Sequence, residues 1–355
     1  MRRRETLFAL PLLMHARPLL AQAARPALGP MTLAFPRDHG AHPELRTEWW
    51  YITGHATSKG REFGFQVTFF RTRVDATQAM TSKFAAKQLV FAHAAVTDVQ
   101  GAKLWHDQRI AREGFEVALA AQGDTRVRLR DWSLQRMGGA YRAVLPGADF
   151  SLDIECTPTQ PVLLQGAQGL SRKGPQEAQA SYYYSQPQLA VTGAIVLRGQ
   201  RFAITGKAWL DHEWSEEVLH PEAVGWDWIG MNLDDGSALT AFRLRRADGS
   251  ALWHGGSFRA AGGATRSFGP DEVSFAAKRS WTSAVSRAAY PVEWTVRTPS
   301  GTYTVKAALD NQELDSRAST GAIYWEGLSD LFDNAGRRVG RGYLEMTGYA
   351  QRLRL

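Results

Sequence analysis

Short runs of β-forming residues, separated by turns that contain glycine or proline, recur through almost the whole chain. The run at residues 49–57 ends at a polar turn, and a second run at residues 63–70 follows at once. This composition and spacing predict a β-hairpin. Further runs follow about every ten residues, whereas helical periodicity is weak almost everywhere. The sequence therefore predicts an all-β protein built as a sandwich or a barrel.

The chain also contains an internal repeat. One tryptophan and two glycines recur at a constant shift of 176 residues: Trp50, Gly54 and Gly60 against Trp226, Gly230 and Gly236. The closing segments of the two halves, around Gly206 and Gly342, match as well. We therefore predict two related domains, residues 31–215 and 216–355. Each has the size of a closed barrel of about eight strands, which leaves no free strand edge and can hold one small ligand.

The first 23 residues have the pattern of a signal peptide. A basic start at Arg2, Arg3 and Arg4 precedes an apolar run at residues 7–13 and a small-residue site at residues 21–23. This pattern predicts export to the periplasm or beyond, by either the Sec or the twin-arginine route. No later run approaches the length of a membrane span, so we expect no transmembrane segment in the mature chain.

Composition excludes several classes of function. The formal net charge is +7, but the basic residues are scattered, so no nucleic-acid partner is predicted. The single cysteine, Cys156, allows neither an intramolecular disulfide nor a multi-cysteine zinc site. No nucleotide-binding loop, nucleophile elbow or His-Glu-x-x-His motif occurs. We therefore predict no cofactor and no metal.

The segment Asp211-His212-Glu213-Trp214 has no counterpart in the second half, which makes it less typical of scaffolding. On a strand, Asp211 and Glu213 would face one side, and His212 and Trp214 the other. His212 could act as a general acid or base near neutral pH, with Asp211 or Glu213 orienting it or titrating. Trp214 could supply an apolar wall. The alternative is a polar junction between domains, in which hydrogen bonds hold His212 in place.

A second cluster is Trp226-Asp227-Trp228. Between two indoles, Asp227 could be desolvated and kept protonated, as proton transfer to an alkene requires. The alternative is a strand whose two indoles pack inward while Asp227 faces water.

Five further residues are candidates for ligand contacts: Glu48, Trp50, His93, Tyr183 and Tyr184. Glu48 precedes Trp49 and Trp50 and could point into a barrel mouth. Tyr183 and Tyr184 could line a pocket or simply pack. His93 lies among apolar residues and is either a ligand contact or a hydrogen-bonded core histidine.

These aromatic motifs resemble those of the AttH-like family, which includes the carotenoid 1,2-hydratases (CrtC) and predicted secreted hydrolases. Six segments carry the resemblance: residues 35–42, 48–54, 91–94, 182–185, 208–214 and 225–228. The resemblance implies two lipocalin-like barrels in tandem and an apolar substrate. It also matches His212 and Trp214 to a histidine and a tryptophan of the hydratases. Their further tyrosine and aspartate are missing from residues 237–245, which leaves carotenoid hydration itself open.

Together these observations predict an exported enzyme, a hydro-lyase or a hydrolase, that acts by acid–base chemistry on an isoprenoid- or lipid-like molecule. The catalytic candidates are His212, Asp211, Glu213 and Asp227. The ligand-binding candidates are Trp214, Trp226, Trp228, Glu48, Trp50, His93, Tyr183 and Tyr184. The alternative is a non-catalytic lipocalin-like carrier of an apolar ligand. An apolar ligand also makes association with a membrane surface an expectation. Substrate identity, the barrel that holds the ligand and the oligomeric state stay open.

Overall fold

The computed structural model describes residues 28–217 and 219–353. Strands joined by turns make up this part of the chain, which contains no α-helix and two short 3-10 turns, η1 (Arg37–His39) and η2 (Asp75–Thr77). The predicted signal segment, residues 1–23, lies outside the described residues. No helix long and apolar enough to cross a membrane occurs within the described range.

The first sheet has 13 antiparallel strands. Their order is β4 (Lys103–Arg112), β3 (Gln88–Asp98), β2 (Arg61–Arg73), β1 (Thr47–Ser58), β13 (Gln200–Glu217), β12 (Ala180–Leu197), β9 (Phe150–Thr157), β8 (Ala140–Pro146), β7 (Trp132–Met137), β6 (Arg126–Leu129) and β5 (Ala118–Ala120). Two short strands, β10 (Leu163–Leu164) and β11 (Leu170–Arg172), pair with β12.

The second sheet has 10 antiparallel strands. Their order is β17 (Thr265–Phe268), β16 (Ala251–Arg259), β15 (Ala238–Arg245), β14 (Gly225–Leu233), β23 (Arg338–Met346), β22 (Ala322–Phe332), β20 (Gly301–Ala307), β19 (Ala289–Thr298) and β18 (Ser274–Thr282). The short strand β21 (Glu313–Ser316) pairs with β22.

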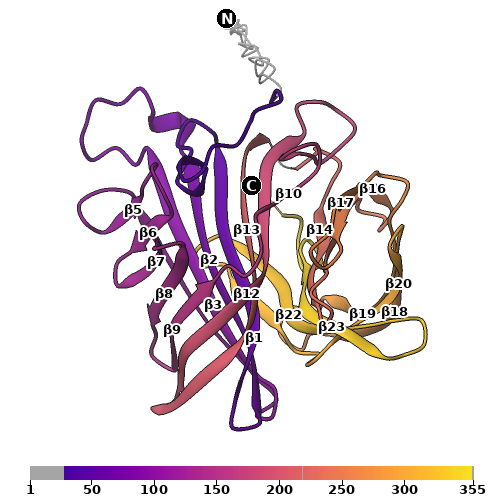
Figure 1. Ribbon diagram of the computed structural model, residues 1–355. Coiled ribbons are helices and arrows are strands. Elements are labelled where there is room, and N and C mark those ends of the chain that lie inside the picture. Colours follow the sequence, from indigo (N-terminus) through magenta and orange to yellow (C-terminus); the bar gives the residue numbers. More distant parts are fainter. Residues whose placement is uncertain (1–27, 218, 354–355) are drawn as a thin grey trace, which may run out of the picture.

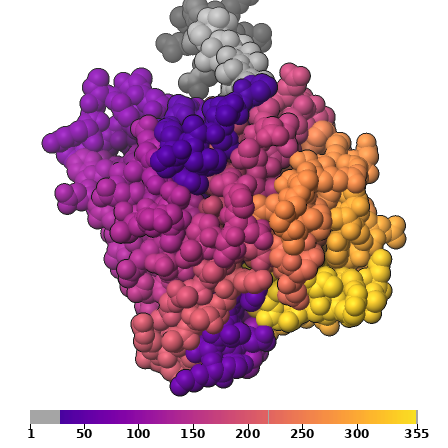
Figure 2. All heavy atoms as spheres, viewed as in Figure 1, coloured from indigo at the N-terminus to yellow at the C-terminus, as the bar shows by residue number. Residues whose placement is uncertain are grey.

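Each sheet curls around its own apolar core, and we call the two bodies the first and the second barrel (Figure 1). The first core contains large buried rings such as Trp50 and Trp132, and the second contains Trp294 and Trp325. The barrels lie in direct contact (Figure 2). The prediction of an all-β chain with two tandem lipocalin-like barrels is therefore confirmed. The first sheet ends at Glu217 and the second begins at Gly225; the domain limits of 31–215 and 216–355 stay a prediction.

The repeat holds at the level of strands but not at the level of side chains. β1 lies between β13 and β2, and β14 lies in the same way between β23 and β15. Trp50 and Ile52 point into the first barrel, whereas Ile229 and Met231 point into the second. The inward positions are thus even-numbered in β1 and odd-numbered in β14. The shift of 176 is an even number, so it matches an inward-facing residue of β1 with an outward-facing residue of β14, because side chains alternate along a strand.

The outer faces of the two barrels meet in a third apolar cluster. Tyr51 and Trp209 of the first barrel pack there with Trp228, Phe242 and Tyr343 of the second. Tyr51 and Trp209 each make an edge contact with Trp228, with ring centroids 5.5 Å and 6.3 Å apart. Positions that would be solvent-facing in a lone barrel are buried here.

Candidate active site

Side chains alternate along β13, so residues 211–214 point in turn to the cavity and to the core of the first barrel. His212 and Trp214 face the core of the first barrel and are fully buried. Asp211 and Glu213 face the second barrel, where both line a cavity. The prediction that Asp211 and Glu213 support His212 is therefore wrong, because a β-strand places neighbouring side chains on opposite faces of its sheet.

The cavity lies between the two barrels and has a volume of about 300 Å³. The first barrel contributes side chains from β1, β2, β3, β4, β12 and β13, and the second from β14, β15, β22 and β23. Most of the lining is apolar, and its aromatic members are Trp49, Tyr51, Phe70, Phe91, Tyr183, Trp226, Trp228, Phe242 and Tyr324. A concave, mostly apolar site with a few polar groups is the usual form of a small-molecule site. Trp226, Trp228, His93 and Tyr183, which the sequence suggested as ligand contacts, all lie in this lining.

Asp211 is the most strongly hydrogen-bonded acid of the cavity. Its Oδ1 accepts hydrogen bonds from Ser185 Oγ at 2.5 Å and Trp209 Nε1 at 2.7 Å, and its Oδ2 accepts one from Tyr183 Oη at 2.8 Å. Burial raises the pKa of Asp211 to about 7, although the three donors act in the opposite direction. Asp211 therefore changes its charge near neutral pH.

A second pair of acids lies on the opposite wall of the cavity. Glu326 on β22 and Glu345 on β23 are directly opposite each other in the strand register. Glu326 Oε2 accepts a hydrogen bond of 2.8 Å from Gln66 Nε2. Burial raises the pKa of Glu345 to about 7, and burial together with the neighbouring Glu345 raises that of Glu326 well above its usual value. The pair therefore holds a proton at neutral pH.

Lys173 is the one lysine or arginine among the described lining residues. Its Nζ lies 3.0 Å from Glu213 Oε1. It also lies 4.6 Å from the ring centre of Tyr183 and 4.5 Å from that of Phe242. The lining thus contains four carboxyl groups and one ammonium group. Such a site favours positive charge in a bound molecule over negative charge.

A chain of neutral hydrogen-bonding groups forms another part of the wall. His93 Nδ1 lies 2.8 Å from Tyr324 Oη, and His93 Nε2 lies 2.8 Å from Ser319 Oγ. Ser319 Oγ also donates to Gln108 Oε1 at 2.7 Å. Burial lowers the pKa of His93 to about 3, so its imidazole is neutral.

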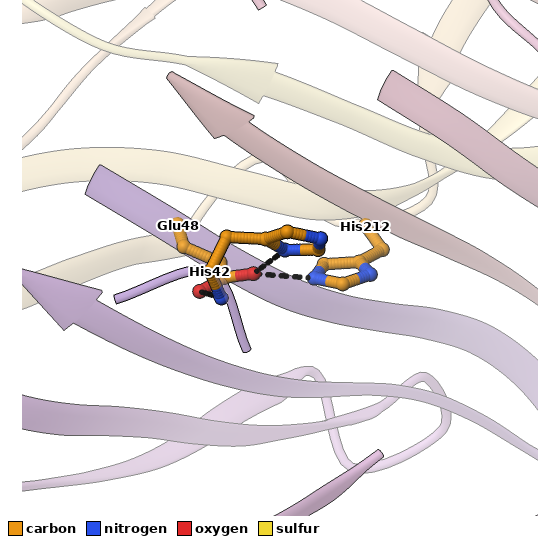
Figure 3. A group of neighbouring side chains, drawn as sticks. All are labelled: His42, Glu48 and His212. Carbon is orange, nitrogen blue, oxygen red and sulfur yellow. Dashed lines mark hydrogen bonds and ion pairs between the residues drawn. The ribbon is translucent and has the colours of Figure 1, made fainter. Parts of the chain in front are cut away.

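His212 lies in a separate cluster inside the first barrel. Figure 3 shows the rings of His42 and His212 directed at one carboxylate oxygen, Glu48 Oε1, at 2.7 Å and 2.9 Å. Arg71 Nε donates to the other oxygen of Glu48 at 2.8 Å. Trp50 stacks on His212 with ring centroids 4.7 Å apart. These side chains are buried, and none of them is part of the cavity lining.

One set of proton positions satisfies His212 and its neighbours. His39 Nδ1 donates to Tyr184 Oη at 2.7 Å, Tyr184 donates to His212 Nδ1 at 3.2 Å, and His212 Nε2 donates to Glu48. Burial lowers the pKa of both His39 and His212, which leaves each imidazole with the single proton that this chain requires. Tyr184, Trp50, Trp214 and Glu48 are therefore core partners of His212 and do not reach the cavity.

His42, Glu48 and His212 could each offer one atom to a metal ion, and these atoms lie within 4.8 Å of one another. The guanidinium group of Arg71 already contacts the same carboxylate, and the imidazoles are hydrogen-bonded to it. A dication would have to displace these contacts beside a fixed positive charge. The geometry therefore favours a hydrogen-bonded core cluster over a metal site.

Asp227 does not have the environment that its neighbouring indoles suggested. It points into the second barrel, where Arg243 Nε and Arg245 Nε lie 2.6 Å and 3.2 Å from its Oδ2. Tyr349 Oη donates to its Oδ1 at 2.8 Å. The predicted apolar setting of Asp227 is therefore wrong, and so is its alternative of a side chain facing water, because Asp227 is fully buried beside two arginines.

Comparison with known proteins settles the family. A family model for AttH-like proteins matches residues 26–349. The chain belongs to the AttH-like family. It is similar to a candidate AttH from Nitrosomonas europaea, with 48% identity and a TM-score of 0.85 over 92% of this chain and 100% of that one. The resemblance read from the aromatic motifs is thereby confirmed.

Two more distant structures share the AttH-like fold. Kievitone hydratase from Nectria haematococca is 14% identical, with a TM-score of 0.70 over 90% of this chain and 94% of that chain. CghA is 12% identical, with a TM-score of 0.53 over 85% of this chain and 88% of that chain. At these identities the likeness shows the fold alone. No match is found among the curated proteins.

Several residues of this AttH-like site escaped sequence reasoning. They are Lys173, Tyr324, Glu326 and Glu345. Each glutamate interrupts an apolar run, as in Trp325-Glu326-Gly327 and Leu344-Glu345-Met346, and that interruption is the signal that could have marked them. Their proximity depends on the register between β22 and β23, which the sequence does not show.

Proposed function

We propose that this AttH-like protein adds water to, or removes water from, a carbon–carbon double bond of an apolar molecule in the cavity between the barrels. One observation carries the proposal: Asp211, Glu326 and Glu345 face a mostly apolar cavity and have raised pKa values. Groups in such a setting can gain and lose protons near neutral pH.

The Glu326–Glu345 pair is the proposed acid. Two adjacent carboxyl groups in a dry site do not both ionise, so one remains able to donate a proton. Transfer of that proton to one alkene carbon leaves a cation on the other carbon. The faces of Trp226 and Trp228 and the ionised carboxylates of the cavity stabilise this charge.

Asp211 is the proposed base. Its three hydrogen-bond donors stabilise the ionised form, and a pKa of about 7 leaves part of the population ionised at neutral pH. Water forms the new carbon–oxygen bond as Asp211 accepts one of its protons. The glutamate pair then regains a proton, and Asp211 loses one to solvent. Dehydration uses the same groups in reverse.

The cavity favours hydration over ester or amide hydrolysis. Ser319 and His93 form a serine–histidine contact in the wall, but the partner of His93 on its other side is Tyr324 and not a carboxylate. With a pKa of about 3, His93 is a weak base for activating a serine hydroxyl. The shared fold of kievitone hydratase supports the same choice.

A carrier without turnover is the second candidate, favoured by the apolar lining of the cavity. We also propose, from the basic and apolar start of the sequence, that the chain is exported to the periplasm or secreted. In either case the ligand would be an isoprenoid- or lipid-like molecule.

The experiment starts from native mass spectrometry and organic extraction of the purified protein. The molecule found, or an isoprenoid alkene as a probe, is then incubated in ¹⁸O-labelled water with wild type, Asp211→Asn, Glu345→Gln and, as a control, Asp153→Asn, which alters an exposed acid. We expect labelled oxygen in the product and a loss of about a hundredfold or more in the two cavity variants alone. Unchanged ligand would indicate a carrier, and full activity of Asp211→Asn would refute the assigned base.

A further inference from the structure

A group of exposed apolar side chains lies beside the ends of β3 and β4. Met80, Phe84 and Phe115 have exposed fractions of 53%, 62% and 50%. The rings of Phe84 and Phe115 stack on each other, with centroids 5.5 Å apart and an interplanar angle of 10°. Neighbouring apolar side chains exposed together on a surface mark a site of contact with another protein, a membrane or a ligand.

The backbone and the neighbouring cations hold these rings outward. Phe115 has φ +56°, a left-handed conformation that is uncommon for a bulky residue. Arg112 lies beside the stacked pair, 4.2 Å from the centre of Phe115 and 5.6 Å from that of Phe84, and its Nη1 donates to the Phe84 carbonyl at 2.6 Å. Lys83 Nζ lies 5.5 Å from the Phe84 ring.

Charge around the group is weighted towards the positive. The loop segment at residues 80–87 contains Lys83 and Lys87 and no acidic residue. On the other side, Glu113 accepts a hydrogen bond from the Ala120 backbone, while Glu116 is exposed. Aromatic rings flanked by lysine and arginine are the combination that inserts into the interface of a bilayer with anionic headgroups.

Arg112 connects the exposed rings to the most exposed part of the cavity lining. Ile110 and Leu89 both line the cavity, and Ile110 is the most exposed of its described lining residues, at 38%. Leu89 is the cross-strand neighbour of Arg112, which lies two residues beyond Ile110 on the same face of β4. The cavity thus reaches the surface next to Phe84 and Phe115.

We propose that Phe84, Phe115 and Lys83, together with Arg112, dock the protein on a lipid bilayer with anionic headgroups, so that an apolar molecule passes from the bilayer into the cavity at Ile110. The inference rests on the proposed function only for the nature of the molecule that enters. Docking itself is a property of the surface, and it is measured without turnover.

The test is flotation of the full chain with vesicles of phosphatidylcholine alone and of phosphatidylcholine mixed with phosphatidylglycerol. We expect binding to the mixed vesicles, and a loss of about tenfold or more for the double variant Phe84→Ser/Phe115→Ser and for Lys83→Glu. The matched control is Met137→Ser/Val285→Ser, which removes two other apolar side chains with exposed fractions of 61% and 74% and should bind as wild type does.

A second readout covers the case in which the double variant misfolds. Mixed vesicles with brominated acyl chains should quench the tryptophan fluorescence of the Phe84→Trp variant more than that of the Asp211→Asn variant treated in the same way. The Asp211→Asn variant should bind vesicles as wild type does. Turnover and vesicle binding are therefore tested separately, and a result on turnover bears on the proposed function and not on docking. Absence of wild-type binding to mixed vesicles, or wild-type binding by a folded Phe84→Ser/Phe115→Ser, would overturn the docking proposal.

Discussion

The raised pKa of Asp211 makes the stability of the fold depend on pH. Its pKa is raised by burial to about 7, from an ordinary value of 3.8. The unfolded chain therefore releases this proton at a lower pH than the native protein does. The stabilising contribution of Asp211 is full below about pH 4 and is lost as the pH rises towards 7.

Asp211→Asn removes that dependence, which gives a prediction about stability. Relative to wild type, the variant should gain free energy of unfolding as the pH rises from about 4 to about 7, by up to about 1.4 kcal/mol per pH unit. Urea denaturation of both proteins over this range measures the difference. A difference that does not change with pH would show that Asp211 is ionised throughout.

Glu48 has the opposite character, since its partners stabilise its charge. Two imidazoles and the Arg71 guanidinium contact its carboxylate, and they hold its pKa well below the usual range despite complete burial. Glu48→Gln should lower the free energy of unfolding by about 3–5 kcal/mol, because it leaves Arg71 buried without a counter-charge. Denaturation measurements would show the loss, and Asp153→Asn, at an exposed ion pair, should change stability by less than about 1 kcal/mol.

At the scale of elements, two glycines lie where the closing strand of each barrel pairs with its first strand. A Cβ on Gly206 of β13 would lie 2.0 Å from the His55 carbonyl oxygen of β1. A Cβ on Gly342 of β23 would lie 1.9 Å from the Gly230 carbonyl oxygen of β14. Backbone occupies both places, so neither strand can accept a side chain without moving. This close approach explains the matching glycines of the sequence repeat.

Gly342→Ala should therefore lower the free energy of unfolding by about 1–3 kcal/mol, since β23 must move away from β14. Thermal or urea denaturation measures the loss. Gly123→Ala serves as the control, because an added Cβ there meets no atom within 4 Å, and it should stay within about 0.5 kcal/mol of wild type. Equal stability of the two variants would mean that the strands separate at little cost.

The strands could be predicted from the sequence, but their register and curvature could not. The β-forming runs predicted β1 and β2, and alternation correctly placed Asp211 and Glu213 on the face opposite His212. Both faces of β13 are buried over residues 208–215, however, so the hydrophobic pattern there does not distinguish the barrel core from the cavity. The meeting of Glu326 with Glu345, and the ion pairs of Asp227, arise from strand register and curvature that a single sequence does not specify.

The whole molecule is held together by apolar and polar contacts across the junction of the barrels. Gln66 of the first barrel donates to Glu326 of the second at 2.8 Å, and Glu62 forms an ion pair with Arg341 at 2.7 Å. The third apolar cluster draws rings from both bodies. Buried apolar rings and polar contacts shared in this way make the two barrels mutually dependent.

We therefore expect the two barrels to unfold in one transition. Differential scanning calorimetry should show a single peak, and Gly342→Ala, which alters only the second barrel, should lower the melting temperature of both. Tryptophans report on each barrel, because Trp50 and Trp132 lie in the first core and Trp294 and Trp325 in the second. Two separate transitions would contradict the prediction and would mean that the cavity can open by domain separation.

The cavity is built from residues that point away from both barrel cores. The inward side chains of each barrel maintain its shape, while the outward side chains at the junction set what the cavity accepts. Selection can therefore act on the two sets separately. A substitution at Trp226 or Leu244 changes the shape of the cavity and leaves either core intact. Paired barrels of this kind can acquire new substrates by changing their shared wall while each barrel keeps the packing on which its folding depends.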